Sequence, residues 1–129
     1  RYSSSAASDV YKRQVFAITS VVDQVTPFKY RLKTYSRIFQ ALRIATNDEL
    51  NHLKFFLDNF IDLLSPQGRI VVISYHSIED RIVKHKFKDL KNKKKMNLIY
   101  KKPLIPSKEE VGLNKRARSA KMRVGEKIG

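Results

Sequence analysis

The sequence predicts an α/β fold in which helices and strands alternate as in the second half of an α/β sheet. Ile70 to Ser74 form a short, β-branched, nearly all-apolar run behind a Pro-Gln-Gly turn. Such a run is typical of a parallel-sheet strand that is covered by helices and buried on both faces. Titratable residues follow it directly, and in open α/β sheets ligands bind just outside the carboxyl ends of strands. The sequence therefore predicts a functional site at the end of this strand.

Composition restricts the class of partner. The 129 residues suffice for one domain, and 27 Lys+Arg against 12 Asp+Glu give a formal net charge of +15. This charge favours a polyanion, because neutralised phosphates release counterions. No run reaches the roughly 18 apolar residues that span a membrane, and no basic amphipathic helix favours a membrane surface. The chain has no cysteine, which fits a reducing compartment. We expect a nucleic-acid partner and a cytoplasmic location.

The amino-terminal part is expected to begin with an unstructured segment. Residues 1–14 are rich in Ser and Ala, have no apolar period, and resemble read-through from foreign sequence. We expect them to be disordered or artefactual and assign them no function. Helical spacing of apolar residues starts at Val15 and stops at Thr26-Pro27.

A long helical region comes next. After a basic connector, Phe28 to Lys33, apolar residues recur every three or four positions from Tyr35 to Leu64. A break near Asn47 or Asp48 could divide this region into two helices.

The second half of the chain contains the remaining strands. Ile78 to Leu90 has helical apolar spacing, and a lysine-rich loop follows it. Asn97 to Lys102 is expected to be a short second strand. Ser107 to Glu110 resembles a capping box that opens a brief helix. Lys121 to Lys127 alternates like a final strand.

The residues after the first strand offer several kinds of site. His76, Ser77, Glu79 and Asp80 are candidate catalytic residues. A metal site is less favoured, because H-x-x-E-D matches no strong zinc pattern. A nucleophilic serine is also less favoured, because neighbouring strand residues point to opposite faces and G-x-S-x-G is absent. The structural alternative stays open: Ser77 caps the helix, the carboxylates lie near its positive end, and Arg81 pairs with one of them.

A second polar group lies on the long helical region. Ser36, Gln40, Arg43 and Asn47 are spaced four, three and four apart, so they share one helical stripe. A solvated surface and a contact with phosphates or base edges are equally supported for this stripe.

Arginines near the carboxyl terminus suit bidentate contacts with phosphates. They are Arg116, Arg118 and Arg123. The tyrosines Tyr30, Tyr35 and Tyr75 could stack on unpaired bases, although core or rim packing is commoner. The four glycines never form G-x-G or a P-loop, so nothing here predicts a cradle for a cofactor phosphate.

Several blocks of sequence together carry a family resemblance. They are Arg37–Leu50, Gly68–Lys84, Lys102–Glu110 and Asn114–Arg123. In this order they resemble the carboxyl-terminal part of the bacterial ribosomal RNA small-subunit methyltransferase H family, also called MraW. The resemblance extends from about Val15 to Lys127.

The resemblance implies a Rossmann-like class I fold that uses S-adenosylmethionine and contains an inserted helical domain. It implies methylation of the exocyclic N4 of a cytidine in the decoding region of 16S rRNA, with the small ribosomal subunit as partner. Residues 15–33 would be the tail of the insertion and a connector. Residues 34–129 would be the carboxyl-terminal part of the methyltransferase domain, and the strands its last three.

The chain also departs from the family pattern. The glycine-rich cofactor loop, the acidic ribose-binding residue and the Asp-Leu-Gly segment lie upstream in the family, so no cofactor-binding residue is expected here and the chain alone is expected to be inactive. Asn114 to Arg118 has Lys where the family has Pro. Lys33 to Ser36 replaces the family's usual His-Pro-Ala-Thr, so no role of that histidine is carried over.

The proposed chemistry needs a group that accepts from the cytosine amino group and stabilises its developing charge. His76 is the first choice as acceptor or orienter, and Asp80 or Glu79 is the second. The residues expected to hold RNA are Arg37, Gln40, Arg43, Asn47, Arg81, Arg116, Arg118 and Arg123. The main alternative is a basic RNA-binding module without catalysis. A metal-dependent hydrolase that uses His76 and Glu79 is weaker.

Overall fold

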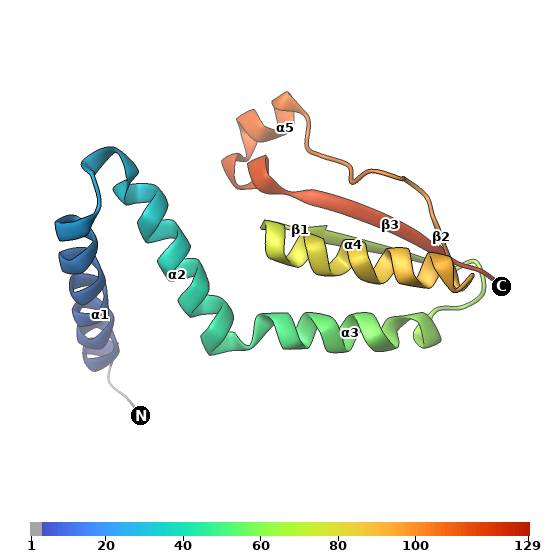
Figure 1. Ribbon diagram of the computed structural model, residues 1–129, viewed down its shortest axis with the longest axis horizontal. Coiled ribbons are helices and arrows are strands. Elements are labelled where there is room, and N and C mark those ends of the chain that lie inside the picture. Colours follow the sequence, from blue (N-terminus) through green and yellow to red (C-terminus); the bar gives the residue numbers. More distant parts are fainter. Residues whose placement is uncertain (1–3) are drawn as a thin grey trace. The chain divides into compact units, whose positions relative to one another are not determined.

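The computed structural model describes residues 4–129. The chain splits into two compact units, Arg1–Glu49 and Leu50–Gly129. The first unit contains α1 (Ser4–Val25), the 3₁₀ helix η1 (Phe28–Tyr30) and α2 (Arg31–Asn47) (Figure 1). Residue 34, where the sequence places a boundary, therefore lies inside α2. No helix within the described residues is both long and apolar enough to cross a membrane.

The helices α1 and α2 pack together in the first unit. Val22 is the buried apolar residue among those of the unit whose burial is described, and the Arg31 side chain donates to the carbonyl oxygen of Thr26 at 3.0 Å. The Tyr35 hydroxyl donates to the carboxylate of Asp23. These contacts tie the start of α2 to the end of α1.

The amino-terminal segment differs from the expectation. The helix α1 begins at Ser4, so the expected disorder is wrong for residues 4–14, and residues 1–3 lie outside the described part. The segment lacks an apolar period, but it contains Ala, Lys, Arg and Gln, which have high helix propensity. Such residues can extend a helix that packing has already nucleated.

The long helical region is divided at Asp48, as the sequence indicates. This residue has φ 51°, in the left-handed region, and it ends α2. Aspartate tolerates this conformation better than most residues. The helix α3 (Glu49–Leu63) starts immediately afterwards, and α2 begins at Arg31 rather than Tyr35, so it includes part of the predicted connector.

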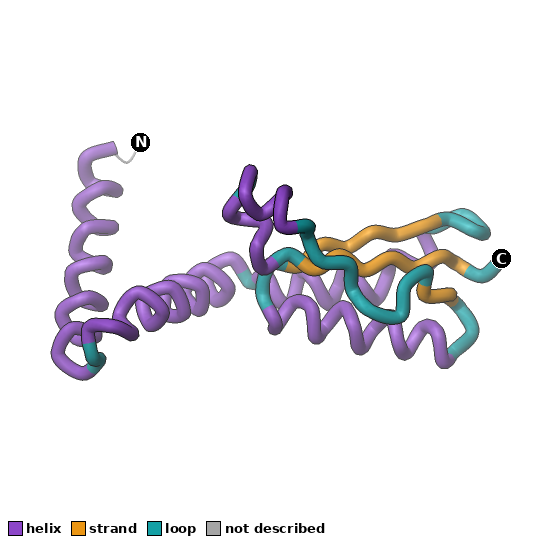
Figure 2. Tube along the Cα trace, turned by 90° about the horizontal axis from the view of Figure 1, so that it is seen from above, coloured by secondary structure: helices purple, strands orange, loops and turns teal. Residues whose placement is uncertain are grey.

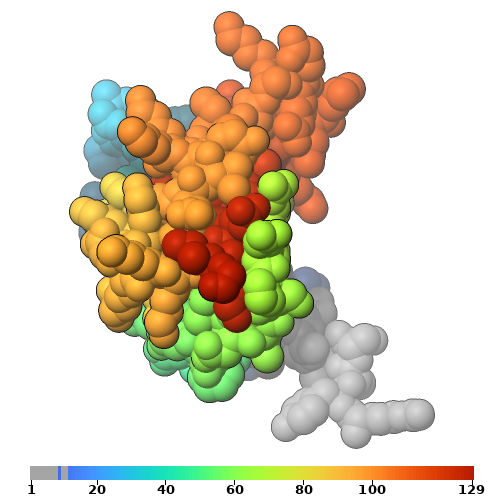
Figure 3. Space-filling model, turned by 90° about the vertical axis from the view of Figure 1, so that its right-hand side faces the viewer, coloured from blue at the N-terminus to red at the C-terminus, as the bar shows by residue number. Residues whose placement is uncertain are grey.

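The second unit contains a three-stranded sheet in the order β1-β3-β2. Its strands are β1 (Arg69–Ser74), β2 (Met96–Leu98) and β3 (Lys121–Lys127). Because β3 is antiparallel to both neighbours, β1 and β2 run in the same direction, and α4 (Ser77–Asn92) connects them. The carboxyl end of β3, red in Figure 3, lies between the green start of β1 and the orange region around β2. The predicted strands are confirmed, but the second is shorter and starts one residue earlier.

The helices α3 and α4 lie on the same face of this sheet (Figure 2). They bury a continuous apolar cluster against it, which accounts for most of the core. The cluster comprises Leu57, Phe60, Ile61, Ile70, Val83, Phe87, Leu90 and Met96.

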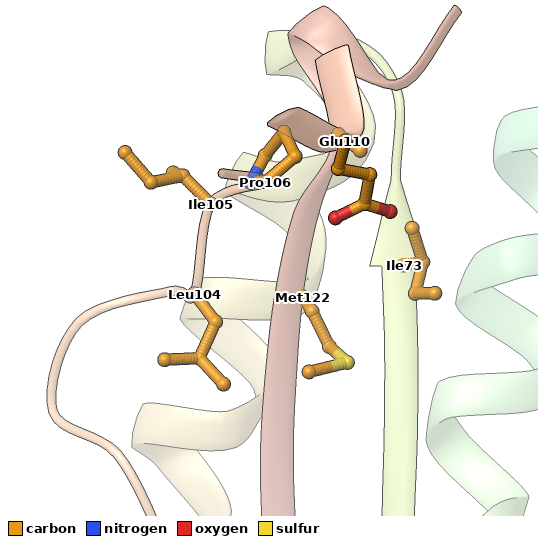
Figure 4. Close-up of a pocket in the computed structure, with 7 residues that line it drawn as sticks. Ile73, Leu104, Ile105, Pro106, Glu110 and Met122 are labelled. Atoms are coloured by element: carbon orange, nitrogen blue, oxygen red, sulfur yellow. The ribbon is translucent and has the colours of Figure 1, made fainter. Parts of the chain in front are cut away.

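The other face of β1 is open. Ile70 and Ser74 are 8% and 3% exposed, whereas Val71 and Ile73 are 55% and 51% exposed. The expectation that this strand is buried on both faces is therefore wrong for the described residues. An apolar pocket of about 150 Å³ lies on the open face beside Ile73 and its cross-strand partner Met122 (Figure 4).

Short helices precede the last strand. Ser107 caps α5 (Lys108–Leu113), because its Oγ accepts from the N–H of Glu110 at 3.2 Å, as the capping-box pattern predicts. The 3₁₀ helix η2 (Lys115–Ser119) follows and leads into β3. The lysine-rich segment after Leu90 is still helical up to Asn92.

Two glycine substitutions test this packing. A Cβ added at Gly125 would lie 2.5 Å from Sδ of Met96, which is fully buried, so Gly125→Ala is expected to lower the free energy of unfolding by about 1–3 kcal/mol. A Cβ at Gly112 in α5 would meet nothing within 4 Å. Gly112→Ala is therefore expected to be neutral or to stabilise by up to ~1 kcal/mol. Urea unfolding followed by circular dichroism measures both, and equal effects would contradict the described contact.

Candidate functional site

The carboxyl end of β1, the start of α4 and the start of β3 meet at one end of the sheet. Ser74 pairs with Lys121 in the sheet, so the end of β1 lies beside the beginning of β3. Tyr75 and His76 connect β1 directly to α4. All four predicted catalytic residues therefore lie within one turn of the strand-to-helix connection.

His76 is the N-cap of α4, whereas the structural alternative from the sequence assigns this role to Ser77. Its backbone is extended (φ −139°, ψ 161°), and its Nδ1 accepts from the N–H of Glu79 at 3.3 Å. Its carbonyl oxygen accepts from the N–H of Asp80 at 3.2 Å. The prediction that Ser77 caps the helix is wrong, because Ser77 is already the first helical residue. The Ser77 side chain is exposed at the surface of the site.

The imidazole of His76 faces the carboxylate of Glu79. With Nδ1 accepting a hydrogen bond, the neutral ring has its proton on Nε2. This Nε2 is buried, lies 3.2 Å from Oε1 of Glu79, and has no well-aligned hydrogen bond within the described residues. Oε2 of Glu79 accepts from the N–H of Tyr75 at 3.2 Å. The connection therefore holds a carboxylate beside an imidazole N–H donor.

Asp80 is bound by Arg123 of β3. The guanidinium donates to both carboxylate oxygens at 2.7 and 3.1 Å, and the Nζ of Lys121 lies 3.7 Å from Oδ2. The two paired side chains are only 10% and 13% exposed. The hydrogen bond from Arg123 holds the pKa of Asp80 below its usual range, although burial acts in the opposite direction. Arg81, which the sequence offered as a partner for a carboxylate, makes no ion pair within the described residues, and Arg123 takes that place.

Exposed arginines lie just before β3. Arg116 and Arg118 project from η2, where Ala117 is the buried residue. The side chain of Asn114 caps this short helix by accepting from the N–H of Arg116 at 3.1 Å. Neither guanidinium forms an ion pair with any residue that the structure describes. The sequence prediction that all three carboxyl-terminal arginines act alike is not matched by their surroundings, since the half-buried Arg123 is bound to Asp80.

The polar stripe of α2 lies in the first unit, and some of its side chains bind other groups of the same unit. The guanidinium of Arg43 binds the carboxylate of Glu49 at 3.0 and 3.3 Å, and the amide of Asn47 donates to it at 3.4 Å. The hydroxyl of Ser36 donates to the carbonyl oxygen of Leu32. Arg37 is exposed and Gln40 is half-buried. The contact with Glu49 was not foreseen, because it depends on the break at Asp48.

The positions of Lys121 and Arg123 beside Asp80 were not predicted from the sequence. The alternation of the final strand contains a signal for them, because alternate residues share one face of the sheet. Lys121, Arg123 and Gly125 share the face that contacts α4 and β2, whereas Met122 lies on the open face.

Comparison with known proteins places these residues in a family context. Residues 8–128 match the model of the MraW methylase family. A ribosomal RNA small subunit methyltransferase H from Rippkaea orientalis is 43% identical, covering 98% of this chain and 43% of the relative. Proteins of the same name from Dictyoglomus thermophilum and Dictyoglomus turgidum are 51% and 49% identical, covering 85% of this chain and 36% of each relative. The chain thus spans less than half the length of these relatives.

The expected resemblance and the expected fold class are confirmed. The small sheet with its helices fits the carboxyl-terminal half of a Rossmann-like class I methyltransferase sheet. The matched range begins at residue 8, so it extends into the segment for which the sequence predicted no family role.

Removal of the Arg123 guanidinium tests the buried pair. Arg123→Gln leaves the Asp80 carboxylate without its bidentate partner, and we expect a loss of roughly 3 kcal/mol in the free energy of unfolding at pH 7. Arg81→Gln, at an exposed position, should change it by less than about 0.5 kcal/mol. Urea unfolding at pH 7 compares the two variants.

The same pair predicts a pH dependence. Because the folded-state pKa of Asp80 is lowered, its contribution is fully present above the unfolded-state pKa of about 3.9. It is lost as the pH falls through the lower folded-state pKa. The deficit of Arg123→Gln should therefore shrink below about pH 4, and a deficit of equal size at pH 7 and at low pH would contradict the assignment.

Proposed function

Because this chain belongs to the MraW methylase family, we propose that it is part of an S-adenosylmethionine-dependent methyltransferase acting on small-subunit rRNA in the cytoplasm. The proposed reaction is methylation of the exocyclic N4 of a cytidine in the decoding region of 16S rRNA. The observation that carries the proposal is the carboxylate and imidazole of Glu79 and His76 at the carboxyl end of β1. Substrates of open α/β sheets bind at this end.

The amino nitrogen of cytosine needs help to react, because its lone pair is delocalised into the ring. A carboxylate that accepts from the amino N–H orients this nitrogen and stabilises the positive charge that develops on it. Glu79 suits this role, since its carboxylate is partly exposed and lies at the positive end of α4. Glu79 is therefore the proposed acceptor.

His76 suits the role of orienter. Its Nδ1 accepts from the helix backbone, so the neutral ring offers a donor to Glu79 rather than a free acceptor to the substrate. Both carboxylate oxygens of Asp80 accept hydrogen bonds from Arg123, so neither is as accessible to a substrate as the carboxylate of Glu79. We propose that Asp80 and Arg123 position the connection, and that exposed Ser77 lines its mouth.

The remaining basic residues suit contacts with the rRNA backbone. Arg81, Arg116 and Arg118 are exposed around the end of the sheet, and their side chains make no ion pair within the described residues. We propose that these guanidinium groups bind phosphates. On α2, the exposed Arg37 suits the same role, with Gln40, Arg43 and Asn47 beside it on the stripe.

The described residues do not fit the cofactor. Gly68 lies in a tight turn after α3, and Gly125 packs on Met96, so neither opens a cradle for S-adenosylmethionine. No G-x-G occurs in the sequence. We propose that another part of the family fold holds the cofactor and that this chain supplies the rRNA-facing wall.

An exchange experiment tests this function. The matching part of the Dictyoglomus thermophilum relative is replaced by this chain, and methyl transfer from S-adenosylmethionine to unmethylated small subunits is measured. Glu79→Gln should lower kcat by about 10²–10⁴-fold with little change in KM, because the acceptor acts mainly in the transition state. Glu109→Gln, on exposed α5, is the matched control and should retain the full rate.

Three outcomes would each contradict part of the proposal. A folded exchange protein that binds S-adenosylmethionine but transfers no methyl group would contradict the assigned reaction. An unchanged kcat in Glu79→Gln would contradict the role of this carboxylate. The chain alone should neither bind the cofactor nor transfer methyl groups. Activity of the isolated chain would contradict the proposal that another part of the family fold holds the cofactor.

A further inference from the structure

A groove on the flank of α4 lies outside the candidate site. It has a volume of about 120 Å³ and lies between α4 and the chain that leaves β2. Lys84, Lys88 and Lys101 line it together with Tyr100, and Phe87 and Leu98 contribute apolar surface. The groove therefore combines cations, an aromatic ring and an apolar floor.

The lysines of this groove lack counter-charges. Lys84, Lys88 and Lys101 are exposed and form no ion pair among the residues that the structure describes. Two other lysines on and just after α4 do have partners, since Lys86 pairs with Asp58 and Lys93 pairs with Asp89. The difference shows that the positive charge of the groove is not neutralised within this unit.

The arrangement of these lysines is unfavourable for the isolated helix. Lys84, Lys88 and Lys91 follow one another at i, i+4 and i+7, so they form one stripe. Like charges at i, i+4 repel one another and destabilise a helix. An anionic partner would remove this repulsion, and its gain would grow with each lysine that it contacts.

One residue links the groove to the candidate site. Arg123 lines the groove and also binds Asp80 in the first turn of α4. Lys84 follows Asp80 by one helical turn, about 6 Å along the axis. A strand that occupies the groove would thus run toward the connection that holds His76 and Glu79.

We propose that this groove binds an unpaired segment of the rRNA, with phosphates on Lys84, Lys88 and Lys101 and one base against the ring of Tyr100. Tyr100 is 48% exposed, so a base can reach its side chain. Single-strand RNA sites commonly combine a basic track with aromatic platforms. This inference rests on the proposed function, because it names where the same rRNA substrate continues beyond the reacting nucleotide.

Binding of a labelled RNA to the 129-residue chain tests the groove. The probe is a fluorescein-labelled single-stranded oligonucleotide with the decoding-region sequence, and its Kd is measured from low to moderate salt. Lys84→Gln with Lys88→Gln should weaken binding and reduce the slope of log Kd against log salt by about 1.4, since each phosphate contact contributes ~0.7 for single strands. Tyr100→Ala should weaken binding roughly 5- to 100-fold, because a stacked base is lost.

Matched controls separate this site from net charge. Lys12→Gln with Lys54→Gln removes the same charge from exposed positions of α1 and α3 and should leave the slope nearly unchanged. The same oligonucleotide annealed to its complement should be less sensitive to Tyr100→Ala, because its bases are already stacked. Thermal melting of each variant should stay near that of the unsubstituted chain.

The outcomes distinguish failure of the groove from failure of the function. If the chain binds the oligonucleotide but the groove variants keep its Kd and slope, the groove proposal is wrong and the proposed function stands. Equal losses in both double variants would also overturn the groove, since they would show general attraction. If polyglutamate displaces the RNA and Tyr100→Ala has no effect, the groove takes acidic protein segments instead. Absence of RNA binding by the unsubstituted chain would count against both proposals.

Discussion

The candidate site depends on the ion pair between the buried Asp80 and the half-buried Arg123. Arg123 lies on β3, the central strand, and Asp80 lies in the first turn of α4. The pair thus fixes the start of the helix against the strand that contacts both other strands. Because the connection through His76 is short, the position at which α4 starts determines the N-cap geometry of His76. Loss of one partner of such a pair is costly, because it leaves the other charge without compensation.

The same central strand explains why one face is covered and the other is open. Because β3 lies between β1 and β2, Arg123 faces α4 and Gly125 lies against Met96 of β2. The close approach of Met96 requires a residue without a side chain at position 125. The position of β3 also places Met122 beside Ile73 on the uncovered face, together with an apolar pocket (Figure 4). An apolar sheet face of this kind is typical of a surface that packs against another layer. Relatives more than twice as long have chain available for that layer.

Local signals in the sequence were enough to predict most elements. The alternation from Lys121 to Lys127, the break near Asp48 and the capping box at Ser107 all depend on neighbouring residues, and all are confirmed. Contacts between residues far apart in the sequence were not predicted. The apolar run Ile70 to Ser74 indicates a strand, but it cannot show that only one face is covered or that its neighbour is antiparallel. The partner of Asp80 is 43 residues away in the sequence, whereas the structural alternative pairs one of the carboxylates with the adjacent Arg81. In the structural alternative, propensity indicates Ser77 as the cap, whereas the extended backbone at His76 decides the position.

Hydrogen exchange at the start of α4 tests most directly whether the Asp80–Arg123 pair holds the site. The amides of Glu79 and Asp80 donate to His76, and the amide of Lys93 donates to Asp89 at the far end of the helix. In Arg123→Gln, we expect the Glu79 and Asp80 amides to exchange about tenfold faster or more, while the Lys93 amide is little changed, because the loss of structure is local. Unchanged exchange at Glu79 and Asp80, or an equal acceleration along the whole of α4, would contradict it.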